Sequence, residues 1–385
     1  MENKRPRLLF VSDPVLNKDG ITQFTSYKLQ GLKIPKPLTR RYRDFDALRK
    51  KFLERWPGVF IPNIPPKKVV GSTDKDTVEL RIEMLNIFLN KLSNIDYLFN
   101  SDEMELFLLD SNNIPKTMEN IKVDSYEELL KKYASVFTDY DDNFDTTTGK
   151  NEQDAFYIKL NNVLPKLKNF RAFILQEKER YSSFQQNYIT VINMLSFYEK
   201  DIMSTYVNND EKKLVFFNMK NVNLCKNISN VQEKIKNPYE RLYDSITEDL
   251  LDVEAMQEAL ESLKGLQDSY NKLTKNLTTV NEQLNDLQVG KTNIMSLLSF
   301  KGKEENMNKL TADKEKIEKE IEQLGKVIQI TTFNMHNEIK KFKNVSLEKY
   351  YKELNQIYKD IERNAKINDE LWDTVIKDKN ISKYK

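Results

Sequence analysis

The spacing of apolar side chains divides the chain into two parts with different expected structures. Within residues 1–150, short apolar runs alternate with turn signals, whereas residues 151–385 carry apolar side chains three and four positions apart over long distances. A repeat of three and four residues places such side chains on one face of a helix. The pattern therefore predicts a compact N-terminal domain that contains strands, followed by long helices.

Three strands are predicted near the N-terminus. Segments 8–13 and 21–28 are rich in β-branched, aromatic and other apolar residues, and the turn Asn17-Lys18-Asp19-Gly20 separates them. This is the pattern of a strand, a turn and a second strand. Residues 38–42 supply the third strand.

Three helices are expected to back this sheet. Apolar side chains share one helical face over residues 45–56, and Pro57-Gly58 ends that helix. A second helix is predicted over residues 77–92 and a third over residues 102–109, with Ser101 as the N-cap of the third.

A short amphipathic helix is predicted in the segment that joins the two parts. Its apolar positions lie at helical spacing between residues 126 and 137, and an acidic run follows at 139–145. Two alternatives remain for the apolar face: it packs on a neighbouring domain, or it lies in the interface of a bilayer. The side chains concerned are Tyr126, Leu129, Leu130, Tyr133 and Phe137.

Three long apolar stripes predict three helices in the C-terminal part. They cover residues 160–198, 250–287 and 310–361. Each helix is expected to reach about 40 residues, or about 60 Å at 1.5 Å per residue. Helices of this length bury their apolar stripes on one another and on a partner chain. Pro165 and Pro238 are the expected bend points.

Composition supports this division and excludes several classes of protein. Residues 151–385 contain 4 of the 9 glycines and 2 of the 11 prolines, two residue types that helices avoid. One cysteine, Cys225, and one histidine, His336, exclude a disulfide framework and a Cys/His zinc site within one chain. The sequence contains no recognisable acid–base, metal-ligand or nucleophile cluster. We therefore expect a protein that is not an enzyme and holds neither a metal nor a cofactor.

The distribution of apolar residues also bears on location. No apolar run reaches the about 18 residues of a membrane-spanning helix. Residues 1–10 are charged and lack the apolar stretch of a secretion signal. We therefore expect a cytoplasmic protein.

Basic residues gather in one part of the N-terminal domain. Residues 40–68 carry nine Lys or Arg against three Asp or Glu. Guanidinium groups beside an aromatic ring suit a phosphorylated ring, because they bind phosphate while the aromatic face stacks. By composition alone, a solvated helix face remains the alternative.

The sequence around this cluster resembles the phosphoinositide-binding PX domain. The matching segments are Arg40-Arg41-Tyr42-Arg43-Asp44-Phe45, Ile64-Pro65-Pro66-Lys67 and Glu79-Leu80-Arg81. The resemblance implies that Arg41 contacts the 3-phosphate of phosphatidylinositol 3-phosphate and that Tyr42 stacks on the inositol ring. It also implies that Lys67, with Lys68 as an alternative, holds the 1-phosphate, and that Arg81 binds the 4- and 5-hydroxyls.

The helical part resembles the BAR domain of sorting nexins, most of all their autophagy-and-recycling branch. The segments that carry this resemblance are Asn237-Pro238-Tyr239, the loop at 290–303 and the pattern Phe342…Tyr350…Leu371-Trp372. The resemblance implies a curved dimer whose basic concave face lies on a membrane. The partner is either a second copy or another PX-BAR protein.

Two further groups are candidates for membrane contact. Val69 and Val70 stand where PX domains insert a loop into lipid, with ordinary loop packing as the alternative. Lys291, Lys301 and Lys303 are candidates for contact at the tip of the helical domain, with solvated charge as the alternative.

The expected fold class is an α+β PX domain, with a three-stranded sheet and helices, followed by an all-α three-helix BAR coiled-coil domain. The expected segments are 1–115 for the PX domain, 116–150 for a linker with an amphipathic helix, and 151–385 for the BAR dimerisation and membrane-curvature domain.

The expected function is that of a peripheral membrane sorting nexin on endosomes. It would bind phosphatidylinositol 3-phosphate and sense or stabilise curved membrane in cargo recycling or autophagy-related trafficking. The alternative is a coiled-coil tether or scaffold that its PX domain recruits to endosomes and that acts mainly through protein partners. The sequence points to no nucleic-acid partner and identifies no cargo.

Overall fold

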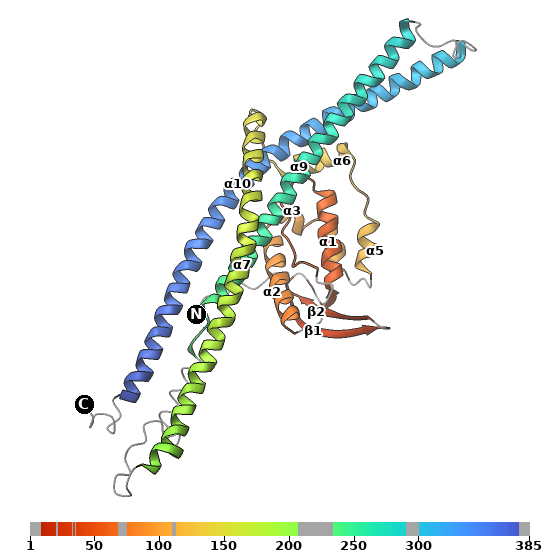
Figure 1. Cartoon of the computed structure of the whole chain (residues 1–385). Helices are drawn as coiled ribbons and strands as arrows, with labels where there is room; N and C mark the ends of the chain where they lie inside the picture. Colours follow the sequence, from red (N-terminus) through yellow and green to blue (C-terminus); the bar gives the residue numbers. More distant parts are fainter. Residues whose placement is uncertain are drawn as a thin grey trace. The chain divides into compact units, whose positions relative to one another are not determined.

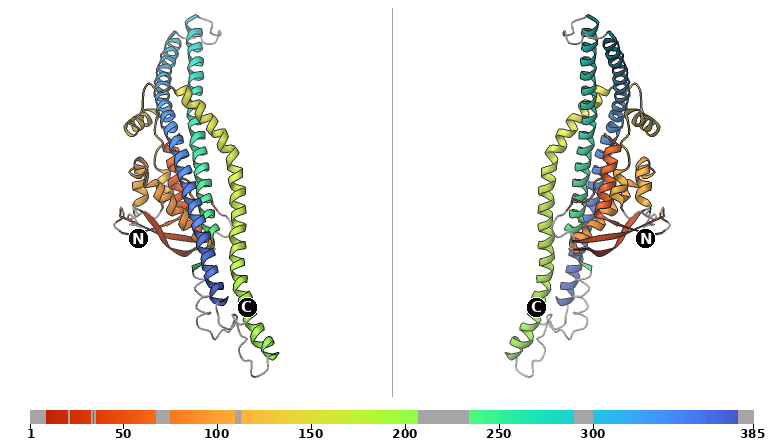
Figure 2. Two further views of the ribbon diagram at one scale, coloured as in Figure 1. Left: turned by 90° about the vertical axis from the view of Figure 1, so that its left-hand side faces the viewer. Right: turned by 90° about the vertical axis from the view of Figure 1, so that its right-hand side faces the viewer.

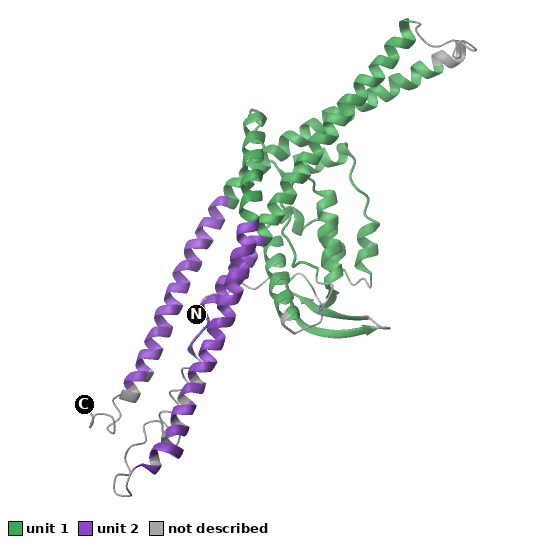
Figure 3. Cartoon of the chain, in the orientation of Figure 1, with its two compact units in different colours: residues 1–164, 251–342 green, residues 165–250, 343–385 purple. Residues whose placement is uncertain are grey.

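The structure is a computed structural model of the chain, and it falls into two compact units. The described residues are 9–20, 22–32, 34, 36–67, 75–109, 113–206, 234–289 and 300–376. Unit 1 comprises residues 1–164 and 251–342, and unit 2 comprises residues 165–250 and 343–385 (Figure 3).

Unit 1 contains the predicted three-stranded sheet, and all its strands are antiparallel (Figure 1). The strands are β1 (Phe10–Asp19), β2 (Thr22–Gln30) and β3 (Leu38–Arg41), in that spatial order. In β1, the backbone N–H of Val11 donates a hydrogen bond to the Asn86 side chain, and the Asn86 amide donates one back to the Val11 carbonyl. The Asn86 side chain thereby pairs with backbone groups at the edge of β1 that could otherwise form hydrogen bonds with another strand.

Short helices follow the sheet in unit 1. They are α1 (Tyr42–Arg55), α2 (Lys75–Leu92), α3 (Asp96–Phe99), α4 (Asp102–Leu108), α5 (Ile114–Glu119) and α6 (Tyr126–Val136). The helices predicted at 45–56, 77–92 and 102–109 correspond to α1, α2 and α4, and Ser101 caps α4 as predicted by accepting the Met104 N–H. Helices α3 and α5 were not predicted, because 4 and 6 residues are too few to display a helical period.

The core beside the sheet is built around α1. Phe45, Leu48 and Phe52 of this helix are fully buried. Phe45 packs edge to face on Phe107 of α4, with 5.2 Å between the ring centroids, and Phe88 of α2 is also fully buried. Each such side chain stabilises the fold by about 1.5–3 kcal/mol when it leaves water.

The three predicted long helices are confirmed (Figures 1 and 2). They are α7 (Thr146–Phe197), α9 (Pro238–Val289) and α10 (Phe300–Ile376), and the short turns η1 (Tyr198–Ile202) and η2 (Met203–Thr205) follow α7. None of these or the other described helices combines the length and the apolarity of a membrane span.

The two prolines of the helical part have different positions. Pro165 lies inside α7, which continues through it. Pro238 is the first residue of α9, so the expectation that it bends a helix is wrong. At a first position proline loses no helical hydrogen bond, because that N–H has no partner within the helix.

Within unit 1, the part that contains the sheet packs directly on α9. The Gly58 N–H donates to Ser262 Oγ over 3.0 Å, and Lys91 of α2 forms an ion pair of 2.6 Å with Asp252. Gly58 has a φ of 77°, which favours glycine, and a Cβ there would lie 3.4 Å from the Leu263 side chain. The compact units therefore do not coincide with the expected segments 1–115, 116–150 and 151–385.

The predicted linker helix is α6, and its apolar face packs inside unit 1. Leu129, Tyr133 and Phe137 are buried, and Tyr126 and Leu130 are half-buried. This is the packing alternative that the sequence left open. A buried side chain is covered by protein in this arrangement, which applies to Leu129, Tyr133 and Phe137. For Tyr126 and Leu130, which are half-buried, contact with a membrane stays a prediction.

Aromatic stacking holds α6 in place. The Tyr133 ring stacks on Trp56 with 5.9 Å between centroids, and its hydroxyl donates to the Pro57 carbonyl over 2.7 Å. Phe137 meets Tyr97 of α3 edge to face at 5.4 Å. The turn after α1 is thereby joined to α6.

A group of half-buried charges strengthens the same contact. Asp124, which precedes α6, accepts hydrogen bonds from Arg55 over 2.8 Å and from Lys132. Arg55 also forms an ion pair with Glu103 of α4 at 3.1 Å. Although burial alone would raise it, the hydrogen bonds and charges of Lys132 and Arg55 hold the pKa of Asp124 below its usual value.

Replacing Tyr133 with alanine is expected to destabilise unit 1 by about 3–5 kcal/mol, because it removes a fully buried ring and its hydrogen bond. Chemical denaturation monitored by tryptophan fluorescence measures this, since Trp56 stacks on the ring. The exposed Val123, replaced by alanine, is the control and should change little. Equal stability of Tyr133→Ala and wild type would contradict the packing of α6.

Candidate functional site

Arg41 lies where β3 ends and α1 begins. Its backbone N–H donates to Asp44 Oδ2 over 2.9 Å, which closes the first turn of α1. Its guanidinium carbon lies 4.7 Å from the centroid of the Phe24 ring in β2. No carboxylate of the described residues lies within ion-pairing distance of this guanidinium. An arginine supported by an aromatic face in this way retains N–H groups for an anionic ligand.

Arg40, the neighbouring arginine, has a structural role. It is buried, and its guanidinium donates to the backbone carbonyls of Phe107, over 2.8 Å, and Leu109. Successive residues of a strand point to opposite faces of the sheet. The sheet therefore turns Arg40 into the core and leaves Arg41 for the candidate site.

Tyr42 and Arg81 lie against each other. The Arg81 guanidinium carbon, from α2, is 4.8 Å from the centroid of the Tyr42 ring, and Arg81 is only 6 % exposed. The Tyr42 hydroxyl donates to the Pro65 carbonyl over 2.6 Å. Burial, with the charge of Asp46, raises the pKa of Tyr42 to about 12 against the opposing charges of Arg81 and Arg49, so the hydroxyl remains a donor at neutral pH.

Lys67 is exposed and belongs to the segment 57–67, called here the proline loop. Two hydrogen bonds hold this loop against α1: Tyr42 binds the Pro65 carbonyl, and Arg49 Nε binds the Pro62 carbonyl over 2.9 Å. Two residues span at most about 7 Å of backbone. The Lys67 backbone therefore lies close to Tyr42.

The structure brings four predicted residues to one place from four elements. Arg41 comes from β3, Tyr42 from α1, Arg81 from α2 and Lys67 from the proline loop. Two guanidinium groups, one ammonium and one aromatic ring form the right chemistry for a phosphorylated, hydroxylated ring.

Sequence reasoning missed Phe24 and Arg49 as parts of this site. A signal for Phe24 exists in the strand register: Ser26 is paired with Arg41, and Phe24, two positions from Ser26, lies on the same face. Arg49 was counted only as part of the basic cluster, because its contacts with the proline loop depend on the fold.

The remaining candidates are only partly within the described residues. Val69, Val70 and Lys291, as well as the alternative Lys68, lie outside them. Lys301 and Lys303 belong to the first turns of α10, and the structure does not describe their side chains. Among the described side chains, no group of His, Cys, Asp and Glu is suited to hold a metal ion.

The PX domain family matches residues 33–111, a range that includes all four candidate residues. Sorting nexin 1 of Arabidopsis thaliana is 29 % identical over 176 residues, which cover 41 % of this chain and 43 % of that protein. Sorting nexin MVP1 of Candida albicans is 33 % identical over 106 residues, which cover 27 % of this chain and 14 % of that protein. The chain thus matches less than half the length of either relative.

A solved structure shares the fold of nearly the whole chain. The SNX-BAR Mvp1 tetramer aligns with 96 % of this chain and 99 % of its own chain, at a TM-score of 0.59 and 14 % identity. The expected fold class, a PX domain followed by long BAR-type helices, is therefore confirmed.

Asp44 is expected to make stability depend on pH. Burial raises the pKa of its carboxyl to about 6 against the charges of Arg40 and Arg43. A carboxyl whose pKa is higher in the folded protein stabilises it while protonated. This contribution is complete below about pH 4 and is lost as the pH rises through about 6.

The variant Asp44→Asn retains a side-chain oxygen that can accept the hydrogen bond from the Arg41 N–H, but it has no carboxyl group that titrates. Between pH 4 and 7, the free energy of unfolding of the wild type should therefore fall by about 2 kcal/mol relative to that of the variant. Denaturant titrations at several pH values measure this difference. Parallel pH profiles of the two proteins would contradict it.

Proposed function

Because this chain is a sorting nexin of the PX-BAR type, we propose that it binds phosphatidylinositol 3-phosphate and stabilises curved endosomal membrane. Its role would be in cargo recycling or autophagy-related trafficking, as a peripheral and non-catalytic membrane protein. The observation that carries the proposal is the convergence of Arg41, Tyr42, Arg81 and the Lys67 loop.

Each of these residues has a separate task in the proposed complex. The Arg41 guanidinium, supported by Phe24, forms charge-assisted hydrogen bonds to the 3-phosphate. The Tyr42 ring stacks on the inositol ring. Arg81, nearly buried beside Tyr42, donates to the 4- and 5-hydroxyls, and the exposed Lys67 meets the 1-phosphate near the membrane surface.

Binding to one headgroup is weak by itself, and a membrane supplies further contacts. Lysine and arginine side chains near an anionic surface add about 1 kcal/mol each. Two linked sites bind more tightly than either alone, because the second contact forms at a high effective concentration. A protein that joins a PX domain to a second membrane-binding surface therefore favours membranes that satisfy both.

Arg41→Gln should reduce binding to vesicles that contain phosphatidylinositol 3-phosphate at least about tenfold, since it removes the cation for the 3-phosphate. Arg43→Gln is the matched control: it makes the same charge change two positions away, and the Arg43 side chain is exposed beside Asp44. Vesicle co-sedimentation with and without this lipid measures both. Equal binding by Arg41→Gln and wild type would contradict the assigned site.

Exposed apolar stripes in unit 2 support association of the chain through its helices. On α10, one stripe contains Leu347, Tyr350, Tyr351, Tyr358 and Ile361. On α7, Phe173, Phe184 and Val191 are also exposed. Continuous apolar surface of this kind marks interfaces between proteins. We therefore include a dimer, formed with a second copy, in the proposed function.

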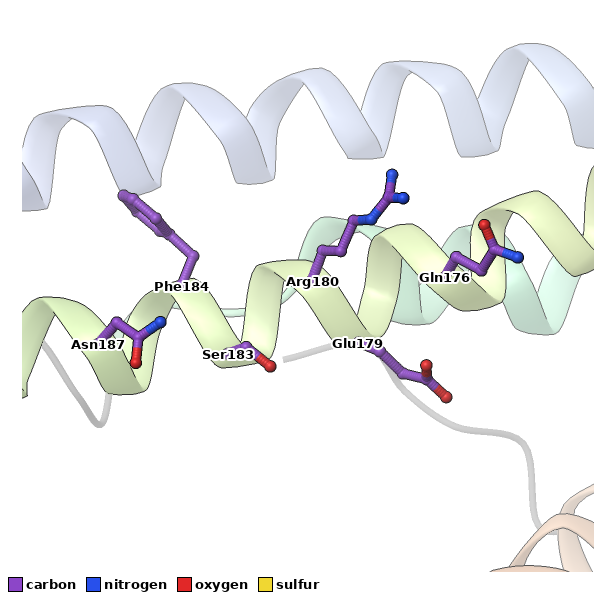
Figure 4. Close-up of a pocket in the computed structure, with 6 residues that line it drawn as sticks. All are labelled: Gln176, Glu179, Arg180, Ser183, Phe184 and Asn187. Atoms are coloured by element: carbon purple, nitrogen blue, oxygen red, sulfur yellow. The ribbon is translucent and has the colours of Figure 1, made fainter.

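A pocket on α7 adjoins this apolar surface (Figure 4). It is lined by Gln176, Glu179, Arg180, Ser183, Phe184 and Asn187. Phe184 is 63 % exposed there and points to the same side of α7 as Arg180, whereas Ser183 and Glu179 point to the other side (Figure 4). An exposed aromatic side chain of this kind is a common anchoring point in an interface.

The double variant Tyr350→Ser/Tyr358→Ser should shift the mass in solution toward that of one 45.5 kDa chain. These tyrosines share one face of α10, whereas Val345, also exposed, lies on the opposite face. Val345→Ser is therefore the control and should keep the wild-type mass. Light scattering of the purified proteins makes the measurement, and a monomeric wild type would contradict self-association.

A further inference from the structure

One arginine holds the proline loop and contacts the long helix α9 at the same time. Arg49 Nε donates to the Pro62 carbonyl over 2.9 Å, and its Nη2 forms an ion pair with Glu258 Oε2 over 2.5 Å. Glu258 lies in α9, and both partners belong to unit 1. The loop that ends at Lys67 is thereby connected to a residue about two hundred positions further along the chain.

Burial makes this arginine sensitive to its partner. The Arg49 side chain is only 10 % exposed, whereas that of Glu258 is 42 % exposed. A guanidinium removed from water needs its N–H groups paired, because an unpaired buried donor is costly. The Glu258 carboxylate pairs with Nη2 and so holds the guanidinium with its Nε–H toward the Pro62 carbonyl.

A second contact between the proline loop and α9 lies at the start of the loop. The Gly58 N–H donates to Ser262 Oγ, one helical turn beyond Glu258. At the other end of the loop, the Tyr42 hydroxyl binds the Pro65 carbonyl. Together with the hydrogen bond from Tyr133 of α6 to the Pro57 carbonyl, the loop is therefore held at four points, and two of them involve α9.

We propose that Glu258 is a positioning residue of the phosphoinositide site: through Arg49 and Pro62 it holds the loop that presents Lys67 to the headgroup. This inference rests on the proposed function of that site. Glu258 itself contacts no lipid. A headgroup site at one end of the chain is thus completed by a residue of the helical domain.

The sign of the effect separates positioning from simple electrostatics. Glu258 is an anion near a basic site, so by charge alone it opposes the binding of a phosphate. Removing it would then tighten binding. If Glu258 acts by positioning the loop, removing it weakens binding.

The test is a calorimetric titration of the full chain with dibutanoyl phosphatidylinositol 3-phosphate, a soluble lipid that reports on the headgroup site alone. Glu258→Ala should weaken binding about five- to tenfold, as expected for residues coupled in one hydrogen-bonded network. Unchanged or tighter binding by a folded Glu258→Ala protein would overturn the proposal.

Asp252→Asn is the matched control. Asp252 also lies in α9 and forms an ion pair with the sheet-containing part, but its partner is Lys91, in the last turn of α2. The substitution removes the same charge from the same helix, and Lys91 belongs to α2 and not to the proline loop. Its affinity should stay within about twofold of wild type, and a loss equal to that of Glu258→Ala would overturn the assignment to this loop.

Two further variants identify the route. In a Lys67→Ala background, Glu258→Ala should cause no further loss, since the side chain that it positions is absent; full additivity would overturn the proposal. Arg49→Lys keeps the charge but lacks the planar guanidinium that donates from Nε to Pro62 and from Nη2 to Glu258. It should therefore lose about as much affinity as Glu258→Ala. If Glu258→Ala does not fold, Arg49→Lys replaces it in the test. Wild-type affinity of a folded Arg49→Lys protein would then overturn the proposal.

Arg41→Gln distinguishes this inference from the proposed function on which it rests. If Arg41→Gln binds the soluble lipid as well as wild type, the headgroup site itself is wrongly assigned. If Arg41→Gln abolishes binding and Glu258→Ala leaves it unchanged, the site is correct and only the positioning role fails.

Discussion

Unit 1 depends on the turn that ends α1, because three other elements meet there. Trp56 packs between aromatic side chains of α3 and α6, with Tyr133 stacked on it, and Gly58 donates a hydrogen bond to Ser262 of α9. Gly58 permits this approach, since its φ of 77° favours glycine and Leu263 lies at contact distance. The proline loop then leaves from the same turn, so the position of Lys67 follows from it.

This turn gives the candidate site two kinds of support. Arg41, Tyr42 and Arg81 are held by elements that are near each other in the N-terminal sequence. The loop that carries Lys67 also contacts Arg49, which forms an ion pair with Glu258 of α9. The segment that matches the PX domain family therefore forms one compact unit with parts of the long helices.

Apolar side chains at helical spacing are buried in one long helix and exposed in another. On α9, Val253, Met256 and Leu260 are buried in unit 1. On α10, Tyr350 and Tyr358 follow a similar spacing and are exposed in unit 2. The period identifies the face of a helix, but only the neighbouring elements decide whether that face is covered. For this reason the sequence left two alternatives for the apolar face of α6, and in the structure Tyr133 packs on Trp56 and Phe137 on Tyr97.

The sequence by itself determined the three strands and the long helices, because these depend on local periodicity and turn residues. The four candidate residues came from the resemblance of short motifs to the PX domain. Tertiary structure decided which of two adjacent arginines turns outward: β3 pairing sends Arg40 to the Phe107 carbonyl and leaves Arg41 beside Phe24. It also decided that Pro238 begins a helix and that Arg49 meets Glu258. Such contacts join residues far apart in sequence, and no local pattern encodes the distance between them.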